Sequence, residues 1–215
     1  MNKYDKKHEV ALVVDEWGTW YDVEPGTNPG FLYQQNTIRD ALVAGINLNI
    51  FNKHCDRVKM ANIAQLVNVL QAVILTDGEK MVKTPTYHVF KMFSCHQGAD
   101  LLDSHITSKQ IGTDENKVPN LTESASMAAD GTINITLNNL SCDEDYDIEG
   151  ILADSRIDSV KCEIVTGAMD AHNTFEKPEE VVLSEYKDIS FEGNRIMVKI
   201  PKCSVMHIAV KVSEK

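Results

Sequence analysis

The chain of 215 residues lacks a long hydrophobic run that could serve as a signal peptide or a membrane span. Its start, MNKYDKKHEV, is polar, and the apolar run that follows covers only residues 10–14. That run is too short for the core of a signal peptide or for a membrane span. Basic residues are also scarce: 21 Lys and Arg stand against 32 Asp and Glu, which gives a net charge of −11. Because such a surface repels phosphate backbones and anionic lipids, we expect no binding to nucleic acid or membranes. The polar start and the short apolar run predict a cytoplasmic protein.

Cysteine, glycine and proline are present in modest numbers and in no recognisable motif. The five cysteines are scattered, none forms a CxxC pair, and His54 stands beside Cys55. This predicts reduced, structural thiols and no metal site. The 11 glycines and 6 prolines are too few for a collagen-like or linker-dominated chain. With 43% hydrophobic and 25% charged residues, the sequence predicts one large globular domain or two small ones.

The first hundred residues have the pattern of apolar runs and turn residues that is typical of an α/β protein. Val10–Val14 is an apolar, β-branched run of the kind buried in a parallel sheet. The Pro- and Gly-rich segment 22–30 predicts a loop, and helical spacing resumes from Tyr33 to Ala44. Gly45 suits a helix end, and Ile46–Phe51 reads as a second strand. Together these segments predict a right-handed βαβ unit.

Two further helices are predicted before residue 100. The stretch from Met60 to Leu75 carries apolar residues at helical spacing and predicts an amphipathic helix on the sheet. Pro85, at a first-turn position, opens a shorter helix that runs through Phe93.

Beyond residue 100 the spacing of apolar residues changes from a helical period to an alternation of apolar and polar residues. Short runs bounded by turn signals recur about every ten residues, which is typical of an antiparallel β-sandwich. Glu192-Gly193-Asn194 predicts a hairpin turn between two of these runs. The predicted strands are HITSKQI, TINITL, YDIEGILA, SVKCEIV, ISFEG, RIMVKI and VMHIAVKV.

An open sheet of two parallel strands cannot close a barrel and leaves its edges and faces uncovered. We therefore expect strands that belong to the same sheet to be missing upstream, as if translation began inside a domain. We also expect the isolated chain to self-associate.

Acidic and aromatic residues gather where the first strand meets its loop. Carboxylates in this place are usual in barrel active sites, and neighbours on a strand point to opposite sides, so only one of Asp15 and Glu16 should face a pocket. Trp17, Trp20 and Tyr21 could stack on a sugar ring. The alternative is that the carboxylates simply end a strand and the rings pack in the core.

Several uncommon strings then occur in a fixed order. They are DEWGTWYDVEPGTNPGFLYQQNT, RDALVAG, NKHCDRVKMANIAQLVNVLQA, TPTYHVF and DAHNTFEKPEEV. In these strings the chain resembles the C-terminal part of family 51 glycoside hydrolases, the intracellular non-reducing-end α-L-arabinofuranosidases. The resemblance implies an α/β plus all-β fold, in which the last two βα units of a (β/α)8 TIM barrel precede a jelly-roll-like β-sandwich. Residues 1–97 would then be barrel and 98–215 sandwich.

The resemblance also implies roles for individual residues. Glu16 matches the nucleophile of a retaining double displacement, which leaves Asp15 as a structural residue. Gln65 would contact arabinose hydroxyls, although periodicity alone places it on the solvated face of a helix, and Trp20 would line the sugar pocket. No metal or organic cofactor is implied, the partners would be arabinose-containing oligosaccharides, and the complete enzymes tend to form hexamers, so we expect a homo-oligomer.

Other polar residues and one missing motif limit this interpretation. His54, Asp56 and Arg57 follow the second predicted strand and are expected to be structural. The family's acid/base glutamate belongs to an Asn-Glu motif after a strand, and no such pattern occurs in this chain. A retaining site needs two carboxyl groups about 5 Å apart. We therefore expect the chain by itself to be inactive.

Two functions remain open on the sequence. The chain is either part of a glycosidase that removes terminal α-L-arabinofuranosyl groups from arabinan and arabinoxylan oligosaccharides, or a non-catalytic β-sandwich module for assembly or carbohydrate binding left from such an enzyme. A preference of the complete enzyme for xylosides or β-glucans also stays open.

Overall fold

The computed structural model describes residues 1–214 and contains one short parallel sheet, two main helices and a β-sandwich. In the first part, β1 (Leu12–Trp17) leads through a long loop with the 3₁₀ turn Pro29–Phe31 into α1 (Ile38–Lys53). The chain continues through β2 (Val58–Ile63), β3 (Ile74–Asp77), β4 (Lys80–Lys83), α2 (Pro85–Phe93) and a 3₁₀ turn at Ser94–His96.

The second part is built from strands. Their bounds are β5 Asp100–Leu102, β6 Gln110–Gly112, β7 Lys117–Pro119, β8 Leu121–Met127, β9 Ile133–Asn139, β10 Tyr146–Ile151, β11 Ser155–Thr166, β12 Ser184–Glu185, β13 Ile189–Glu192, β14 Arg195–Ile200 and β15 Ser204–Glu214.

The β-sandwich is confirmed. An antiparallel sheet in the order β12-β11-β15-β9-β8-β5 faces a smaller sheet in the order β10-β14-β13. Aliphatic side chains from both sheets, such as Ile164, Ile200 and Met206, form the core between them. The hairpin at residues 192–194 joins β13 to β14 as predicted. Of the run HITSKQI, however, only its last two residues join a strand, and β5 and β8 were not predicted.

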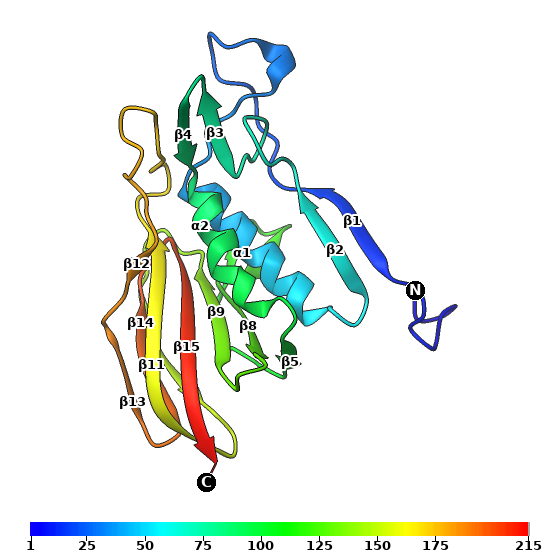
Figure 1. The fold of residues 1–215 in the computed structure, drawn as a ribbon, viewed down its shortest axis with the longest axis vertical. Coiled ribbons are helices and arrows are strands. Elements are labelled where there is room, and N and C mark those ends of the chain that lie inside the picture. The colour runs from blue at the N-terminus through cyan, green and yellow to red at the C-terminus, as the bar shows by residue number, and fades with distance from the viewer. Residues whose placement is uncertain (215) are drawn as a thin grey trace.

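Helices α1 and α2 pack against the opposite face of the larger sheet (Figure 1). Ile38 and Val89 from the helices meet Val165 and Val205 from the sheet in a second apolar cluster. Thr84 caps α2 by accepting a hydrogen bond from the backbone of Tyr87, so the predicted helix at Pro85 is confirmed. The larger sheet is therefore covered on one face by helices and on the other by the smaller sheet.

The predicted strand Ile46–Phe51 is wrong, because these residues belong to α1. The buried positions of α1 include Ile38, Leu42, Gly45 and Asn49, which follow a helical period. Gly45 is consequently not a helix end: it lies inside α1, where a β-carbon would come within 2.5 Å of the Asn138 side chain of β9. The helix also begins at Ile38 rather than Tyr33, with a capping box formed by Thr37 and Asp40.

The predicted helix from Met60 to Leu75 is also wrong. This stretch forms β2, then an irregular segment, then the start of β3. Asn68 and Leu70 have positive φ values of 61° and 52°, which a right-handed helix cannot contain. Residues 70–73 are buried consecutively instead of at every third or fourth position, which explains why the apolar spacing was misleading.

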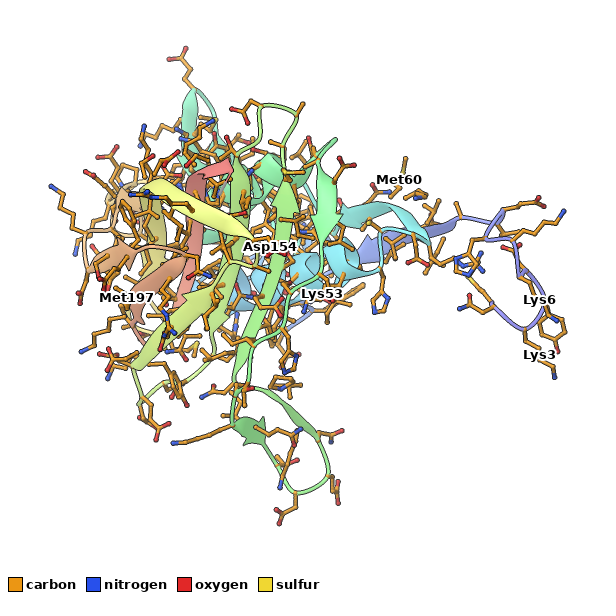
Figure 2. All side chains as sticks on the ribbon, turned by 90° about the horizontal axis from the view of Figure 1, so that it is seen from below. Lys3, Lys6, Lys53, Met60, Asp154 and Met197 are labelled. Carbon is orange, nitrogen blue, oxygen red and sulfur yellow. The ribbon has the colours of Figure 1, made fainter. Side chains whose placement is uncertain are left out.

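The β1–β2 pair is a two-stranded parallel sheet that stands out from the rest of the chain (Figures 1 and 2). Val13 and Met60 are paired in register and are 47% and 54% exposed. In Figure 2 the segment that carries Lys3 and Lys6 extends beyond the body of the molecule. The predicted first strand thus exists, but its partner is β2 and four of its six residues are exposed.

Candidate functional site

The candidate site lies where β1 and β2 end together. The strands are parallel, Trp17 is in register with Ile63, and the backbone N–H of Ala64 donates to the carbonyl of Trp17 at 2.8 Å. Glu16 is the last residue but one of β1, and Gln65 follows β2 by two residues. Both side chains are exposed. The structure therefore brings the predicted nucleophile and the predicted sugar contact to the same end of the two-stranded sheet. Gln65, however, lies in an irregular segment and not on a helix.

The strand register is irregular at the two carboxylates. Between Val14 and Trp17, β1 advances three residues while β2 advances two, from Ala61 to Ile63. A bulge of this kind re-aims side chains and is common beside active sites. Strict alternation therefore does not decide which of the two adjacent carboxylates, Asp15 or Glu16, faces the site. The assignment of Glu16 stays a prediction based on the motif.

The three aromatic residues after β1 have different environments. Trp17 is partly buried, stacks on Phe90 at 6.0 Å and meets Phe51 edge-on at 5.4 Å, so it packs against α1 and α2. Tyr21 lies against the guanidinium of Arg39, with 3.7 Å between the ring centre and Cζ. Trp20 is 68% exposed. Of these rings, Trp20 has the freest surface for stacking on a sugar.

A buried polar network holds the loop that carries Trp20. Thr19 donates from its hydroxyl to Asp40 at 2.6 Å, and its backbone N–H donates to Gln71 at 3.0 Å. The Gln71 amide donates in turn to the backbone carbonyl of Asp40 at 2.6 Å. Gln34 accepts from the backbone of Tyr21 at 2.9 Å. Because Asp40 and Gln71 are fully buried, this network fixes the backbone between the strand end and the aromatic residues.

Sequence reasoning missed this network. The signal for Asp40 was present, because Thr37 and Asp40 are spaced as a capping box at a helix start. Gln71 had no local signal, since its partners Thr19 and Asp40 are distant in sequence. The wrong helix prediction for its segment concealed it further.

His54, Asp56 and Arg57 lie at the opposite end of the strands. The Arg57 carbonyl accepts from the backbone of Leu12, where β1 begins. The Arg57 guanidinium pairs with Asp5, and His8 contacts Asp56 at 3.1 Å. The pKa of Asp5 is lowered to about 2, first by the backbone N–H of Val10 and then by Arg57.

These contacts anchor the N-terminal segment, and His54, Asp56 and Arg57 lie away from the strand ends that carry Glu16 and Gln65. Among residues 1–214, no group of three or more His, Cys, Asp or Glu side chains is arranged to hold a metal ion. Within the same range, no helix is long and apolar enough to cross a membrane.

Comparison with known proteins identifies the family. A sequence model described as the α-L-arabinofuranosidase C-terminal domain matches residues 15–204. The chain belongs to this family. It is 45% identical over 213 residues to an intracellular exo-α-L-arabinofuranosidase from Bacteroides ovatus, covering 98% of this chain and 41% of that protein. It is also 32% identical over 190 residues to α-L-arabinofuranosidase C from Emericella nidulans, covering 85% of this chain and 37% of that one.

A solved structure supports the same assignment. The GH51 arabinofuranosidase from Xanthomonas axonopodis pv. citri superposes with a TM-score of 0.94 at 44% identity, over 98% of this chain and 43% of that chain. The chain therefore spans less than half the length of the arabinofuranosidases that it matches, and it corresponds to a C-terminal domain of such enzymes.

Proposed function

We propose that this chain is the C-terminal part of a retaining exo-α-L-arabinofuranosidase and contributes the nucleophile Glu16. The observation that carries the proposal is that Glu16 and Gln65 occupy adjoining ends of two parallel strands, exposed at one edge of the sheet. The names of the relatives support terminal α-L-arabinofuranosyl groups as the substrate class, and we infer that arabinan or arabinoxylan oligosaccharides carry these groups.

In the proposed reaction the Glu16 carboxylate attacks the anomeric carbon of the arabinofuranosyl group and forms a covalent glycosyl-enzyme, which water then hydrolyses. Gln65 donates to and accepts from sugar hydroxyls through its amide. Trp20 offers an aromatic face to the ring. The buried contacts of Thr19 with Asp40 and Gln71 keep the strand end rigid, so that little reorganisation accompanies attack.

The second carboxyl group is assigned to polypeptide outside residues 1–215. Residues 1–97 would then supply the last two βα units of an eight-stranded barrel, and residues 98–215 the sandwich domain. The exposure of Val13 and Met60 supports this assignment, because strands of a closed barrel are covered by neighbours. As the Bacteroides ovatus relative is named intracellular, we place the complete enzyme in the cytoplasm, and we expect it to form a homo-oligomer.

The alternative is a non-catalytic sandwich module. The candidate site itself separates the two functions, because a module that serves only assembly has no use for a carboxylate at the end of β1. If the alternative holds, changes at Glu16 will leave the activity of the assembled protein unaltered.

The test uses a chimera. Residues 1–215 replace the matching C-terminal segment of the Bacteroides ovatus relative, whose remaining part provides the other strands. We expect the chimera to hydrolyse an aryl α-L-arabinofuranoside faster than an aryl β-xyloside. In that chimera, Glu16→Gln lowers kcat by at least about 10³-fold, because an amide is not an anionic nucleophile.

Asp15→Asn in the same chimera is the matched control. It removes the neighbouring charge and keeps the side-chain shape, and we expect it to retain most of the activity. Equal losses in the two variants, or full activity in Glu16→Gln, would contradict the assigned role. An inactive chimera with a native circular dichroism spectrum and melting transition would favour the non-catalytic module.

A further inference from the structure

Two of the five free cysteines meet at one end of the sandwich. Cys142 lies in the connection from β9 to β10 and is exposed, whereas Cys203 directly precedes β15 and is 4% exposed. The backbone N–H of Cys203 donates to the carbonyl of Ser141 at 2.9 Å, and the Cys203 thiol lies 3.4 Å from the same oxygen. Standard bond lengths around this hydrogen bond hold the two cysteine Cα atoms within about 7 Å, the range that a disulfide requires.

The two connections that carry these cysteines are fixed to each other. Asn139, which is fully buried, donates through its side-chain amide to the carbonyls of Glu144 at 2.9 Å and Pro201 at 3.0 Å. The backbone N–H of Lys202 donates to Asp145 at 3.0 Å. Because these bonds join the β9–β10 connection to the β14–β15 turn, the two thiols are held near each other in the reduced protein.

The chemical environments of the two thiols differ. Burial and, next, the neighbouring Cys142 thiol raise the pKa of Cys203 to about 11, so that Cys203 stays protonated at neutral pH. Cys142 is exposed and can meet a small reagent. Of the other thiols, burial raises the pKa of Cys95 and Cys162 to about 12. An accessible thiol beside a buried one is the arrangement of an attacking and a resolving cysteine.

We propose that Cys142 and Cys203 are a redox-sensitive pair that forms a disulfide by exchange with a low-molecular-weight disulfide. First, Cys142 loses its proton to solvent and its thiolate attacks one sulfur of the small disulfide; that S–S bond breaks, and one small thiol leaves with a proton. Cys203 then loses its proton and attacks the Cys142 sulfur, which releases the second small thiol. The two protein thiols are oxidised to one disulfide, and the small disulfide is reduced to two thiols.

The disulfide would tie two surface turns to the junction between the helices and the sandwich. Cys203 packs in the apolar cluster that contains Ile38 of α1 and Val89 of α2. A covalent link at this point restricts the unfolded chain and stabilises the folded one. We therefore expect oxidation to raise the melting temperature, and reduction with dithiothreitol to reverse the rise.

The experiment incubates the full chain with oxidised glutathione, quenches free thiols with an alkylating agent and maps the cysteines by mass spectrometry after digestion. We expect a peptide pair linked through Cys142 and Cys203, with no alkylated form of either cysteine, whereas the reduced chain is alkylated at Cys142. Cys55→Ser, which removes another exposed thiol, should leave this link in place.

The single variants separate the two steps. Cys203→Ser should stop at a glutathione adduct on Cys142, and Cys142→Ser should give no link and no adduct at Cys203. Adducts that persist on Cys142 in the unaltered chain would overturn the proposal, as would a link through Cys55, Cys95 or Cys162. Unreacted Cys142 and Cys203 after prolonged incubation would overturn it as well.

Discussion

At the scale of single residues, the least predictable features are those set by partners distant in sequence. The irregular pairing at Asp15 and Glu16 depends on how β1 pairs with β2, and no local sequence pattern predicts it. By contrast, the motif around Glu16 lies at the end of β1, beside the end of β2 that Gln65 follows. The sequence could therefore nominate a candidate residue, whereas the orientation of its side chain depends on a strand register that only the folded pair defines.

Gly45 shows the same dependence and allows a direct test. Gly45→Ala should lower the free energy of unfolding by about 1–3 kcal/mol, because the new β-carbon would lie 2.5 Å from the buried Asn138 side chain. This net loss already includes the gain of about 1 kcal/mol in helix propensity that alanine brings. Urea denaturation measures the difference.

Two controls accompany this measurement. Gly150→Ala in β10 has its nearest neighbour at 4.0 Å and should change stability by less than about 1 kcal/mol. In an Asn138→Ala background, Gly45→Ala should become neutral or stabilising. If the cost of Gly45→Ala is the same in both backgrounds, the contact with Asn138 is not its cause.

At the scale of elements, the sandwich was more predictable than the parallel part. Period two in the sequence identified β9, β10, β11, β13, β14 and β15, and of these β10 and β14 alternate strictly in burial. Ile46–Phe51 and Met60–Leu75 were misassigned because a short apolar run does not distinguish helix from strand. Tertiary contacts determine the structure of both segments. Helix α1 buries one face on the large sheet, and hydrogen bonds of Leu70 and Gln71 hold the segment after β2.

Between the helices and the large sheet lies a histidine whose protonation should control stability. His96 contacts the hydroxyls of Ser126 at 2.7 Å and Thr136 at 3.0 Å. Burial, and then the nearby His207, lowers the pKa of His96 to about 4. In the unfolded chain a histidine titrates near 6.5. The unfolded state therefore binds more protons between these values, and stability should rise with pH across this window and level off above it.

We expect the free energy of unfolding to increase from pH 5 to pH 7, and His96→Asn to reduce that increase. A single group contributes at most roughly 1.4 kcal/mol per pH unit. A residual slope should remain, because burial lowers the pKa values of His88 and His207 as well. His105→Asn, on an exposed loop, serves as the control. A steeper or unchanged slope in His96→Asn would contradict this account.

At the scale of the whole molecule, β1 and β2 form a sheet of only two strands, and no other described strand pairs with it. Val13 and Met60 expose apolar surface on strands whose backbone edges are open to pairing. Such strands template contacts with other chains. We expect residues 1–215, expressed alone, to form oligomers in analytical ultracentrifugation and to show no turnover of an aryl α-L-arabinofuranoside.

The double variant Val13→Lys, Met60→Lys should shift these oligomers toward monomer, because charge on an open sheet opposes pairing. Ile151→Lys, which replaces a 63% exposed residue of the sandwich, is the matched control and should leave association unchanged. A monomeric unaltered chain, or an equal effect of the control, would show that β1 and β2 do not drive association.

The central claim is that Glu16 is the nucleophile of the complete enzyme, and covalent labelling tests it most directly. The active chimera is incubated with a mechanism-based arabinofuranosyl inactivator that traps the glycosyl-enzyme, and the labelled peptide is sequenced by mass spectrometry. The account predicts a single arabinofuranosyl ester on Glu16 and none in Glu16→Gln. A label on Asp15 or on any other residue, or a label that persists in Glu16→Gln, would contradict it.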